Sequence, residues 1–131
     1  MRTLPAASAL RATYPTAHLA WLVEPASASL LGSQPWIDEV IVFPRSELSG
    51  SLASLRLGAF TRGLRGFVAA LRERSFDLVV DFHAILKSGL LARASGAPRR
   101  ASYGPPFARE GSWRLANLRA VLTAALVRWP V

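Results

Sequence analysis

The chain has 131 residues, of which 51% are hydrophobic and 18% are charged. This is the composition of a globular domain with its own core, and it excludes an intrinsically disordered chain. The absence of cysteine excludes a disulfide framework and a thiolate metal site, and the two histidines, His18 and His83, lie far apart in the sequence. We therefore expect neither a metal nor a cofactor.

The net charge is +8, from fifteen arginines and one lysine against eight acidic residues. This excess favours an anionic partner such as a phosphorylated glycolipid or a nucleotide, although a general preference for arginine over lysine would give the same charge. We expect no nucleic-acid partner, because the aromatic residues do not alternate with the basic ones and no known binding motif occurs. No run reaches the roughly 18 apolar residues of a membrane span, and the start lacks a signal-peptide pattern. A cytoplasmic location is expected, with peripheral membrane contact left open.

The first half of the chain is predicted to alternate helices with short strands. A helix that begins near Thr3 ends at Pro15, and Pro25 ends the strand that follows. Serine and glycine dominate residues 46–54, which predicts a loop. Over residues 55–74, leucine and phenylalanine recur at helical spacing opposite a face of arginines, which predicts a long helix. The predicted elements of this half are helices 3–14, 26–31 and 55–74 and strands 17–23 and 37–43.

The second half continues the alternation. Its predicted elements are strands 76–81 and 100–103 and helices 86–94 and 112–129. The order α-β-α-β-α-β-α-β-α is typical of a parallel sheet with crossover helices. We therefore expect one α/β domain over residues 1–131, a Rossmann-like parallel sheet with helices on both faces.

The stretch FDLVVDFHAILKSG, residues 76–89, predicts a buried strand, a tight turn and a helix. In doubly wound sheets this turn lies at the carboxyl end of the strand, where ligands bind. Four polar side chains follow the strand there, and they are the first candidates for a site: Asp81, His83, Lys87 and Ser88.

Four segments carry a resemblance to a known family. They are TLPA at residues 3–6, HLAWLVE at residues 18–24, DLVVDFHAILKS at residues 77–88 and FARE at residues 107–110. In this order they resemble the amino-terminal half of the heptosyltransferases of lipopolysaccharide assembly (glycosyltransferase family 9). The match covers residues 3–113.

The resemblance implies the amino-terminal half of a GT-B fold, in which two Rossmann-like domains face each other across a cleft. These enzymes move a heptose from an ADP-sugar onto the inner core of a lipid-anchored acceptor, generally without a metal. The amino-terminal half holds the acceptor and the other half holds the nucleotide sugar. A chain of this kind would bind an anionic, lipid-linked sugar in the cytoplasm, at the periphery of the inner membrane.

The sequence departs from the family pattern at several places. The family begins with a strand and an S-x-G-D loop whose Asp is the general base, but here Met1 stands where that loop would end. We therefore expect a sheet without its first strand, no catalytic residue, and no ADP-sugar binding unless a donor domain is supplied. Residues 114–131 are predicted to form a divergent helical tail. Within the turn, His83 replaces the usual Gln and Ala84 replaces the usual Gly.

The resemblance and the chemistry together select the predicted acceptor contacts. Lys87 lies in the first turn of its helix, where free amides add anion affinity, and Ser88 follows it. Arg109 follows the rigid turn GPP, and its guanidinium suits carboxylates and phosphates. Arg99 and Arg100 are weaker candidates for the same acceptor.

Structural alternatives remain open for each of these residues. Lys87 and Ser88 fit an ordinary helix surface, and Arg109 fits an ion pair with Glu110 or Asp81. Asp81 fits a cap of the next helix better than a base, and His83 fits a turn residue without a catalytic part.

A sheet without its central first strand would leave the strands at residues 17–23 and 76–81 without their shared neighbour. Unpaired strand edges expose backbone amides and carbonyls, so self-association through them is one expected consequence.

Two functions follow from the sequence. The first is an incomplete glycosyltransferase that is inactive alone. The second is a stand-alone basic α/β module that binds an anionic glycolipid or a nucleotide. The second requires a stable monomer, so sharp thermal unfolding of a monodisperse sample would favour it, and aggregation would favour the first.

Overall fold

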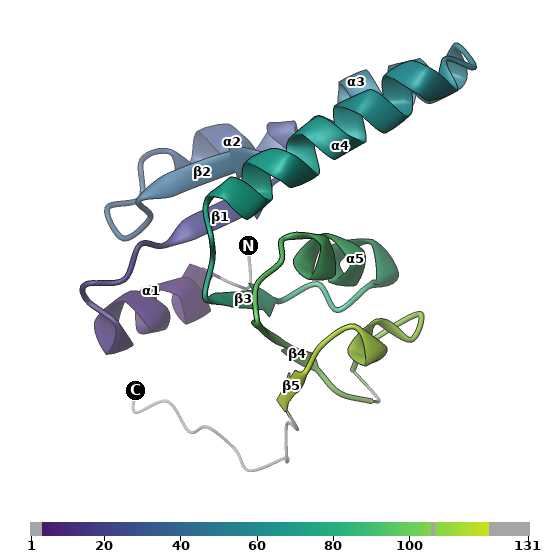
Figure 1. Cartoon of the computed structure of the whole chain (residues 1–131). Coiled ribbons are helices and arrows are strands. Elements are labelled where there is room, and N and C mark those ends of the chain that lie inside the picture. The colour runs from purple at the N-terminus through teal and green to yellow at the C-terminus, as the bar shows by residue number, and fades with distance from the viewer. Residues whose placement is uncertain (1–3, 106, 121–131) are drawn as a thin grey trace. The chain divides into compact units, whose positions relative to one another are not determined.

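The computed structural model describes residues 4–105 and 107–120 (Figure 1). It has the predicted α/β class, with short parallel strands and helices between them. The chain divides into two compact units, residues 1–67 and residues 68–131, which are described in turn. Among the residues described, no helix is both long enough and apolar enough to cross a membrane.

In the first unit, strand β1 (Ala20–Val23) pairs in parallel with β2 (Glu39–Val42), with Ala20 opposite Glu39. Helix α1 (Leu4–Thr13) precedes β1, and α2 (Pro25–Leu31) connects the strands. Pro25 begins α2 because its fixed φ suits the first helical position, where no amide is required. Among the side chains of this unit that the structure describes, the buried ones are Ala7, Val23, Leu31, Ile41 and Leu48.

Arg11 ties α1 to the segments that lead into both strands. Its guanidinium donates to the carbonyls of Trp36 and Ala17, at 3.3 and 2.7 Å, and forms an ion pair with Asp38. The same carboxylate oxygen of Asp38, Oδ2, also accepts a hydrogen bond from the backbone amide of Leu19 at 2.7 Å. The Leu19 amide and then the Arg11 guanidinium hold the pKa of Asp38 below its ordinary value.

Residues 46–54 are not the predicted loop. They belong to α3 (Arg45–Ala53), in which the hydroxyls of Ser49 and Ser54 donate to the carbonyls of Ser46 and Gly50. The helix forms because Leu48 is buried, a tertiary contact that outweighs the weak helix propensity of serine and glycine.

Helix α4 (Leu57–Glu73) confirms the predicted long helix. A Cβ at Gly63 would lie 3.3 Å from Leu48 Cδ2, so the missing side chain allows α3 and α4 to approach closely. Further along α4, the ring of Phe67 packs edge-on against Phe43, with 5.3 Å between centroids.

In the second unit, strands β3 (Leu78–Asp81), β4 (Arg99–Tyr103) and β5 (Leu118–Ala120) form a parallel sheet in that order. Helix α5 (Leu86–Ala94) connects β3 to β4 and has the predicted bounds. Asp81 lies opposite Ser102 in the β3–β4 register. The chain therefore reaches the carboxyl ends of β3 and β4 at the same edge of this sheet (Figure 1).

The helix predicted over residues 112–129 is wrong where the structure describes it. The chain forms a 3₁₀ turn, η1 (Ser112–Arg114), and then β5, and residues 121–129 lie outside the described part. The chain forms a strand here because Asn117 aligns it with β4 through both its backbone and its side chain. The backbone amide of Asn117 donates to Arg100 O at 3.1 Å, and its side-chain Oδ1 accepts from Arg100 N at 2.7 Å.

The strands form two sheets, β1–β2 and β3–β4–β5. Among the described residues, β1 pairs with β2 and β3 pairs with β4. Self-association through the strand edges stays a prediction.

We predict that Asp38→Asn lowers the melting temperature at pH 7, since it removes the negative charge that pairs with Arg11 and strengthens the hydrogen bond from Leu19 N. Because folding lowers the pKa of Asp38, its charged carboxylate stabilises the fold at every pH above 3.8, the ordinary pKa of this group. This stabilisation is lost as the pH falls through the lowered pKa. The difference between variant and wild type should therefore close below pH 3.8.

Thermal unfolding followed by circular dichroism across this range measures the effect. Asp77→Asn is the control, because no hydrogen bond or ion pair of Asp77 occurs in the described residues. A difference that is independent of pH, or equal in the two variants, would contradict the role given to Asp38.

Candidate functional site

Asp81 ends β3 and organises the turn that follows, residues 82–85. Its carboxylate is buried. Oδ1 accepts from the amides of His83 and Ala84, at 3.0 and 3.1 Å, and Oδ2 accepts from the Ser88 hydroxyl at 2.9 Å. Both oxygens of this acid are therefore used to hold the turn against the first turn of α5. Asp81 thus caps the turn before α5, whereas the helix itself begins after Ile85.

Ala84 has a φ of +51°, in the left-handed region that favours glycine, and it is 1% exposed. Its carbonyl accepts two hydrogen bonds from a distant segment, from Arg109 N at 2.8 Å and from Ser112 Oγ at 2.7 Å. The conformation explains why glycine suits this position, and the two bonds explain what holds an alanine there. The turn and residues 109–112 therefore fix each other.

The same distant segment also reaches the start of α5. The Leu86 amide donates to Glu110 Oε2 at 3.1 Å, which places a carboxylate at the positive end of the helix dipole. Glu110 itself has a φ of +55°. Within α5, the Ser88 hydroxyl accepts from Ile85 N at 3.3 Å, which satisfies a second amide.

Gly89 allows the residues after Glu110 to pack closely against α5. A Cβ at this position would lie 3.0 Å from Leu115 Cδ1 and 3.5 Å from Ser112 Cβ. Only a glycine lets α5 approach the η1 turn this closely without moving Leu115. The α5–η1 contact therefore depends on Gly89.

The structure brings five predicted site residues together at the carboxyl end of β3. Asp81 and Ser88 are bonded to each other, and His83 and Lys87 are exposed on the turn and on the first turn of α5. The side chain of Arg109 is exposed, and its backbone amide donates a hydrogen bond to the carbonyl of Ala84.

Arg99 and Arg100 lie elsewhere. They begin β4, and Arg99 is opposite Leu78, three residues before Asp81, which is about 10 Å along the strand. Arg100 Nε donates to Leu115 O at 3.0 Å and Nη1 to Ala97 O at 2.8 Å. Arg100 is thus occupied with backbone carbonyls at the opposite edge of the sheet, and an acceptor contact by either arginine stays a prediction.

Two residues of this arrangement, Glu110 and Ser112, were not among the sequence candidates for binding. Ser112 is followed by Trp113 and carries no charge, so nothing in its local pattern marks it. Glu110 belongs to the FARE segment, so the family resemblance pointed to it. Its hydrogen bond from Leu86 N spans 24 residues and is visible only in the structure.

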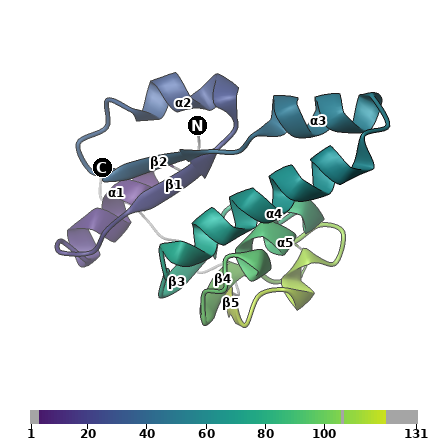
Figure 2. The same ribbon diagram turned by 45° about the horizontal axis from the view of Figure 1, so that its top comes forward.

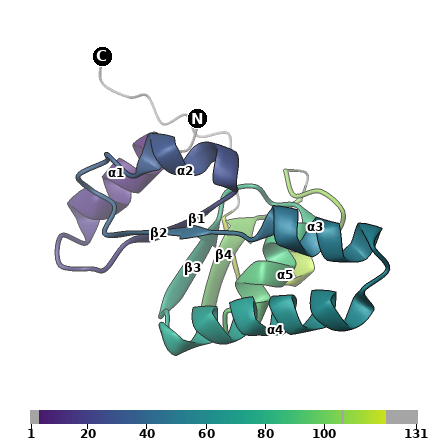
Figure 3. The same ribbon diagram turned by 90° about the horizontal axis from the view of Figure 1, so that it is seen from above.

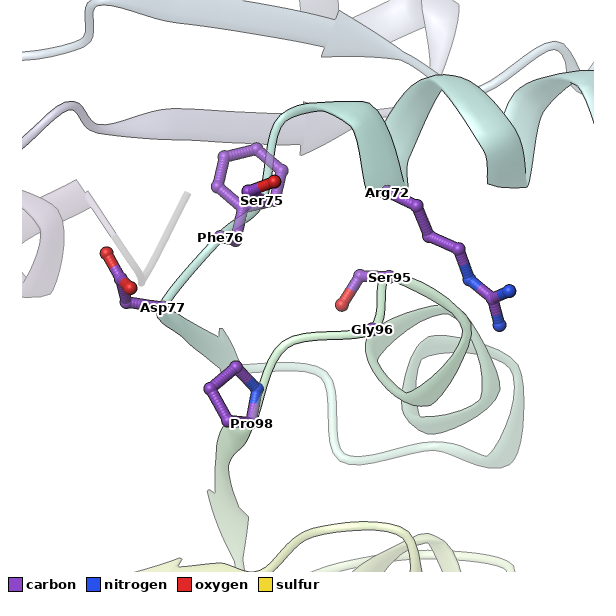
Figure 4. A pocket seen from close by; sticks show the side chains of 7 residues that line it. All are labelled: Arg72, Ser75, Phe76, Asp77, Ser95, Gly96 and Pro98. Atoms are coloured by element: carbon purple, nitrogen blue, oxygen red, sulfur yellow. The ribbon is translucent and has the colours of Figure 1, made fainter.

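A pocket of about 470 Å³ lies at the amino end of β3, away from these residues (Figure 4). Its lining includes Phe76, Asp77 and Pro98, and Arg72, whose Nε donates to Ala94 O at 2.8 Å. The lining contains none of the predicted contacts. In the described part of the chain, no three acidic or histidine side chains gather in a way that could hold a metal ion.

The fold is similar to that of ADP-heptose LPS heptosyltransferase II from E. coli. The TM-score is 0.62 and the identity is 22%. The similarity covers 88% of this chain and 29% of that one, so the present chain spans less than a third of its length. No protein-family model and no curated protein matches the chain. The predicted resemblance is confirmed for the fold.

We predict that Ala84→Gly leaves stability within about 0.5 kcal/mol of wild type. Relief of the left-handed strain, about 1–2 kcal/mol, offsets the lost methyl burial, about 0.8 kcal/mol, and the greater freedom of the unfolded chain. Ala92→Gly is the matched control, because Ala92 is also buried but lies inside α5. There the same change should cost about 1–2 kcal/mol.

Urea unfolding of both variants measures the two free energies. Equal destabilisation by the two substitutions would show that Ala84 does not adopt the left-handed conformation.

Proposed function

We propose that this chain is the acceptor-side part of a glycosyltransferase that moves a heptose from an ADP-sugar to the inner core of lipopolysaccharide. Two findings support the proposal. The fold is similar to that of a heptosyltransferase, and three of the five predicted acceptor contacts, Lys87, Ser88 and Arg109, lie at the edge of a parallel sheet where ligands bind. The observation that carries it is the bond from Arg109 N to Ala84 O, at 2.8 Å, because it brings Arg109 beside the helix of Lys87 and Ser88.

The chemistry of this edge fits an anionic sugar. Lys87 supplies a compact positive charge and Arg109 supplies a planar fork for a carboxylate or phosphate. Both are exposed, whereas the acids nearby, Asp81 and Glu110, are directed to the Ser88 hydroxyl and the Leu86 amide. In the described part of the chain, neither carboxylate forms an ion pair with Arg109. Both accept hydrogen bonds from neutral donors of α5, and the bond to Glu110 holds the segment of Arg109 and the helix of Lys87 together.

Asp81 is a poor general base in this arrangement. A base needs a lone pair directed at the acceptor hydroxyl, but both oxygens of Asp81 accept hydrogen bonds and the residue is buried. We therefore assign no catalytic role to Asp81. Binding of ADP-sugar is proposed only for a protein in which a donor domain accompanies this one, and a lipid-linked acceptor would place that protein at the periphery of the inner membrane.

The alternative is a stand-alone module that binds an anionic glycolipid or a nucleotide. The observation that favours it is that Lys87, Ser88 and Arg109 all belong to the second unit, so the proposed contacts need no other part of the protein. Binding of ADP alone by this chain, with affinity equal to that for the acceptor sugar, would support the alternative over the acceptor role.

We predict that the chain binds a deacylated inner-core oligosaccharide that carries carboxylates and phosphates, and that Lys87→Ala and Arg109→Ala each weaken binding about 5- to 10-fold. One charge-assisted hydrogen bond at an exposed site accounts for this loss. Isothermal titration calorimetry at low salt measures it.

Arg99→Ala is the matched control, since Arg99 is an exposed arginine of the same unit at the opposite edge of the sheet. It should leave the affinity unchanged. An equal loss in Arg99→Ala and Arg109→Ala would indicate attraction by net charge alone and would contradict the proposed site.

A further inference from the structure

Three leucines stand in solvent at the corner between α3 and α4, residues 52–57. Leu52 is 46% exposed, Leu55 is 85% exposed and Leu57 is 62% exposed. Figure 2 shows this corner where the two helices meet, and Figure 3 shows it from above. Single exposed leucines are common, but three within six residues form an apolar surface that lacks a partner in the described residues.

The corner is an ordered turn. Leu55 N donates to Leu52 O at 3.0 Å and Arg56 N donates to Ser51 O at 2.9 Å. These are the two bonds of a Schellman motif at the end of α3. The turn therefore fixes the backbone positions from which the exposed side chains project.

Leu55 is an unusual residue for its place in this motif. It has a φ of +54°, a conformation that glycine adopts without strain and leucine does not. The strain is not compensated by burial, because Leu55 is the most exposed of the large hydrophobic side chains described. A strained and exposed apolar residue is more readily explained by an interaction outside the chain than by folding.

The charge around the corner has one sign. No acidic residue occurs between Glu47 and Glu73 in the sequence, whereas Arg56, Arg62 and Arg65 are all exposed. Arg56 lies between Leu55 and Leu57, so cationic and apolar groups are presented together. Aliphatic side chains among arginines, without exposed aromatic rings at the corner, suit the boundary between lipid headgroups and acyl chains better than stacked bases.

The corner also has the reach that such a contact requires. Helix α4 packs against Phe43 through Phe67, and ten residues separate Phe67 from Leu57, or about 15 Å of helix. Insertion into the headgroup region requires about 5–10 Å.

We propose that the α3–α4 corner docks on the surface of an anionic lipid bilayer. The side chains of Leu52, Leu55 and Leu57 enter the boundary between headgroups and acyl chains, and Arg56 lies against the lipid phosphates. This proposal does not rest on the proposed acceptor site, because membrane docking is measured without sugar or transfer.

The test is co-sedimentation of the full chain with vesicles of phosphatidylethanolamine and phosphatidylglycerol, and with vesicles of phosphatidylcholine alone. Wild type should bind the anionic vesicles, less at high salt, and bind the neutral vesicles weakly. Leu55→Gly removes one inserted side chain and should weaken binding about tenfold. Because glycine suits the left-handed position, this variant should melt at or above the wild-type temperature.

Leu30→Ser is the matched control, since Leu30 is 51% exposed but lies on α2, away from the corner. It should bind vesicles as wild type does, and Arg56→Gln should lose part of the binding to anionic vesicles only. Three outcomes would overturn the proposal: no binding by wild type, full binding by a folded Leu55→Gly, or equal loss in Leu30→Ser. Dimerisation that depends on Leu55 without vesicle binding would also overturn it, in favour of a second copy of the chain.

Discussion

The left-handed conformation of Ala84 is the constraint on which the second unit depends. It turns the chain sharply between β3 and α5, and bonds from two directions maintain it. Asp81 accepts the amide of Ala84, while the Ala84 carbonyl accepts from Arg109 and Ser112. Every polar group of the turn that these bonds involve is buried or half-buried, so loss of one partner would leave another unsatisfied.

This constraint links the fold to the proposed binding of an anionic sugar. Arg109 N and Ser112 Oγ both donate to the carbonyl of Ala84, and these bonds bring Arg109 to the helix of Lys87 and Ser88. Glu110 contributes from the same segment by bonding the Leu86 amide at the start of α5. The segment that carries Arg109 is thus held by buried hydrogen bonds at this edge, whereas Arg99 and Arg100 lie at the other end of β4, where Arg100 bonds to Leu115 O and Ala97 O.

The sequence predicted the elements whose patterns are local and failed where distant contacts decide. Helix α5 was predicted with its observed bounds because leucine and alanine follow a turn signal directly. Helix α3 was missed because burial of Leu48 outweighs its serine-rich composition, and β5 was missed because Asn117 bonds to a strand 17 residues away. In the site, Asp81 and Ser88 were recognised as candidates from their place at the end of a predicted strand and in the helix after it. Their bond to each other, and the parts played by Glu110 and Ser112, depend on a segment that no local pattern places beside the turn.

Residues 109–112 are held on the turn, and amide hydrogen exchange of Arg109 tests this attachment most directly. Its amide donates to a carbonyl of a residue that is 1% exposed. We therefore predict exchange far slower than in an unstructured peptide, although Arg109 lies in a loop with an exposed side chain. The next amide, that of Glu110, has no acceptor among the described residues and should exchange rapidly. Equally rapid exchange of both amides would show that the segment is free of the turn and would contradict the account.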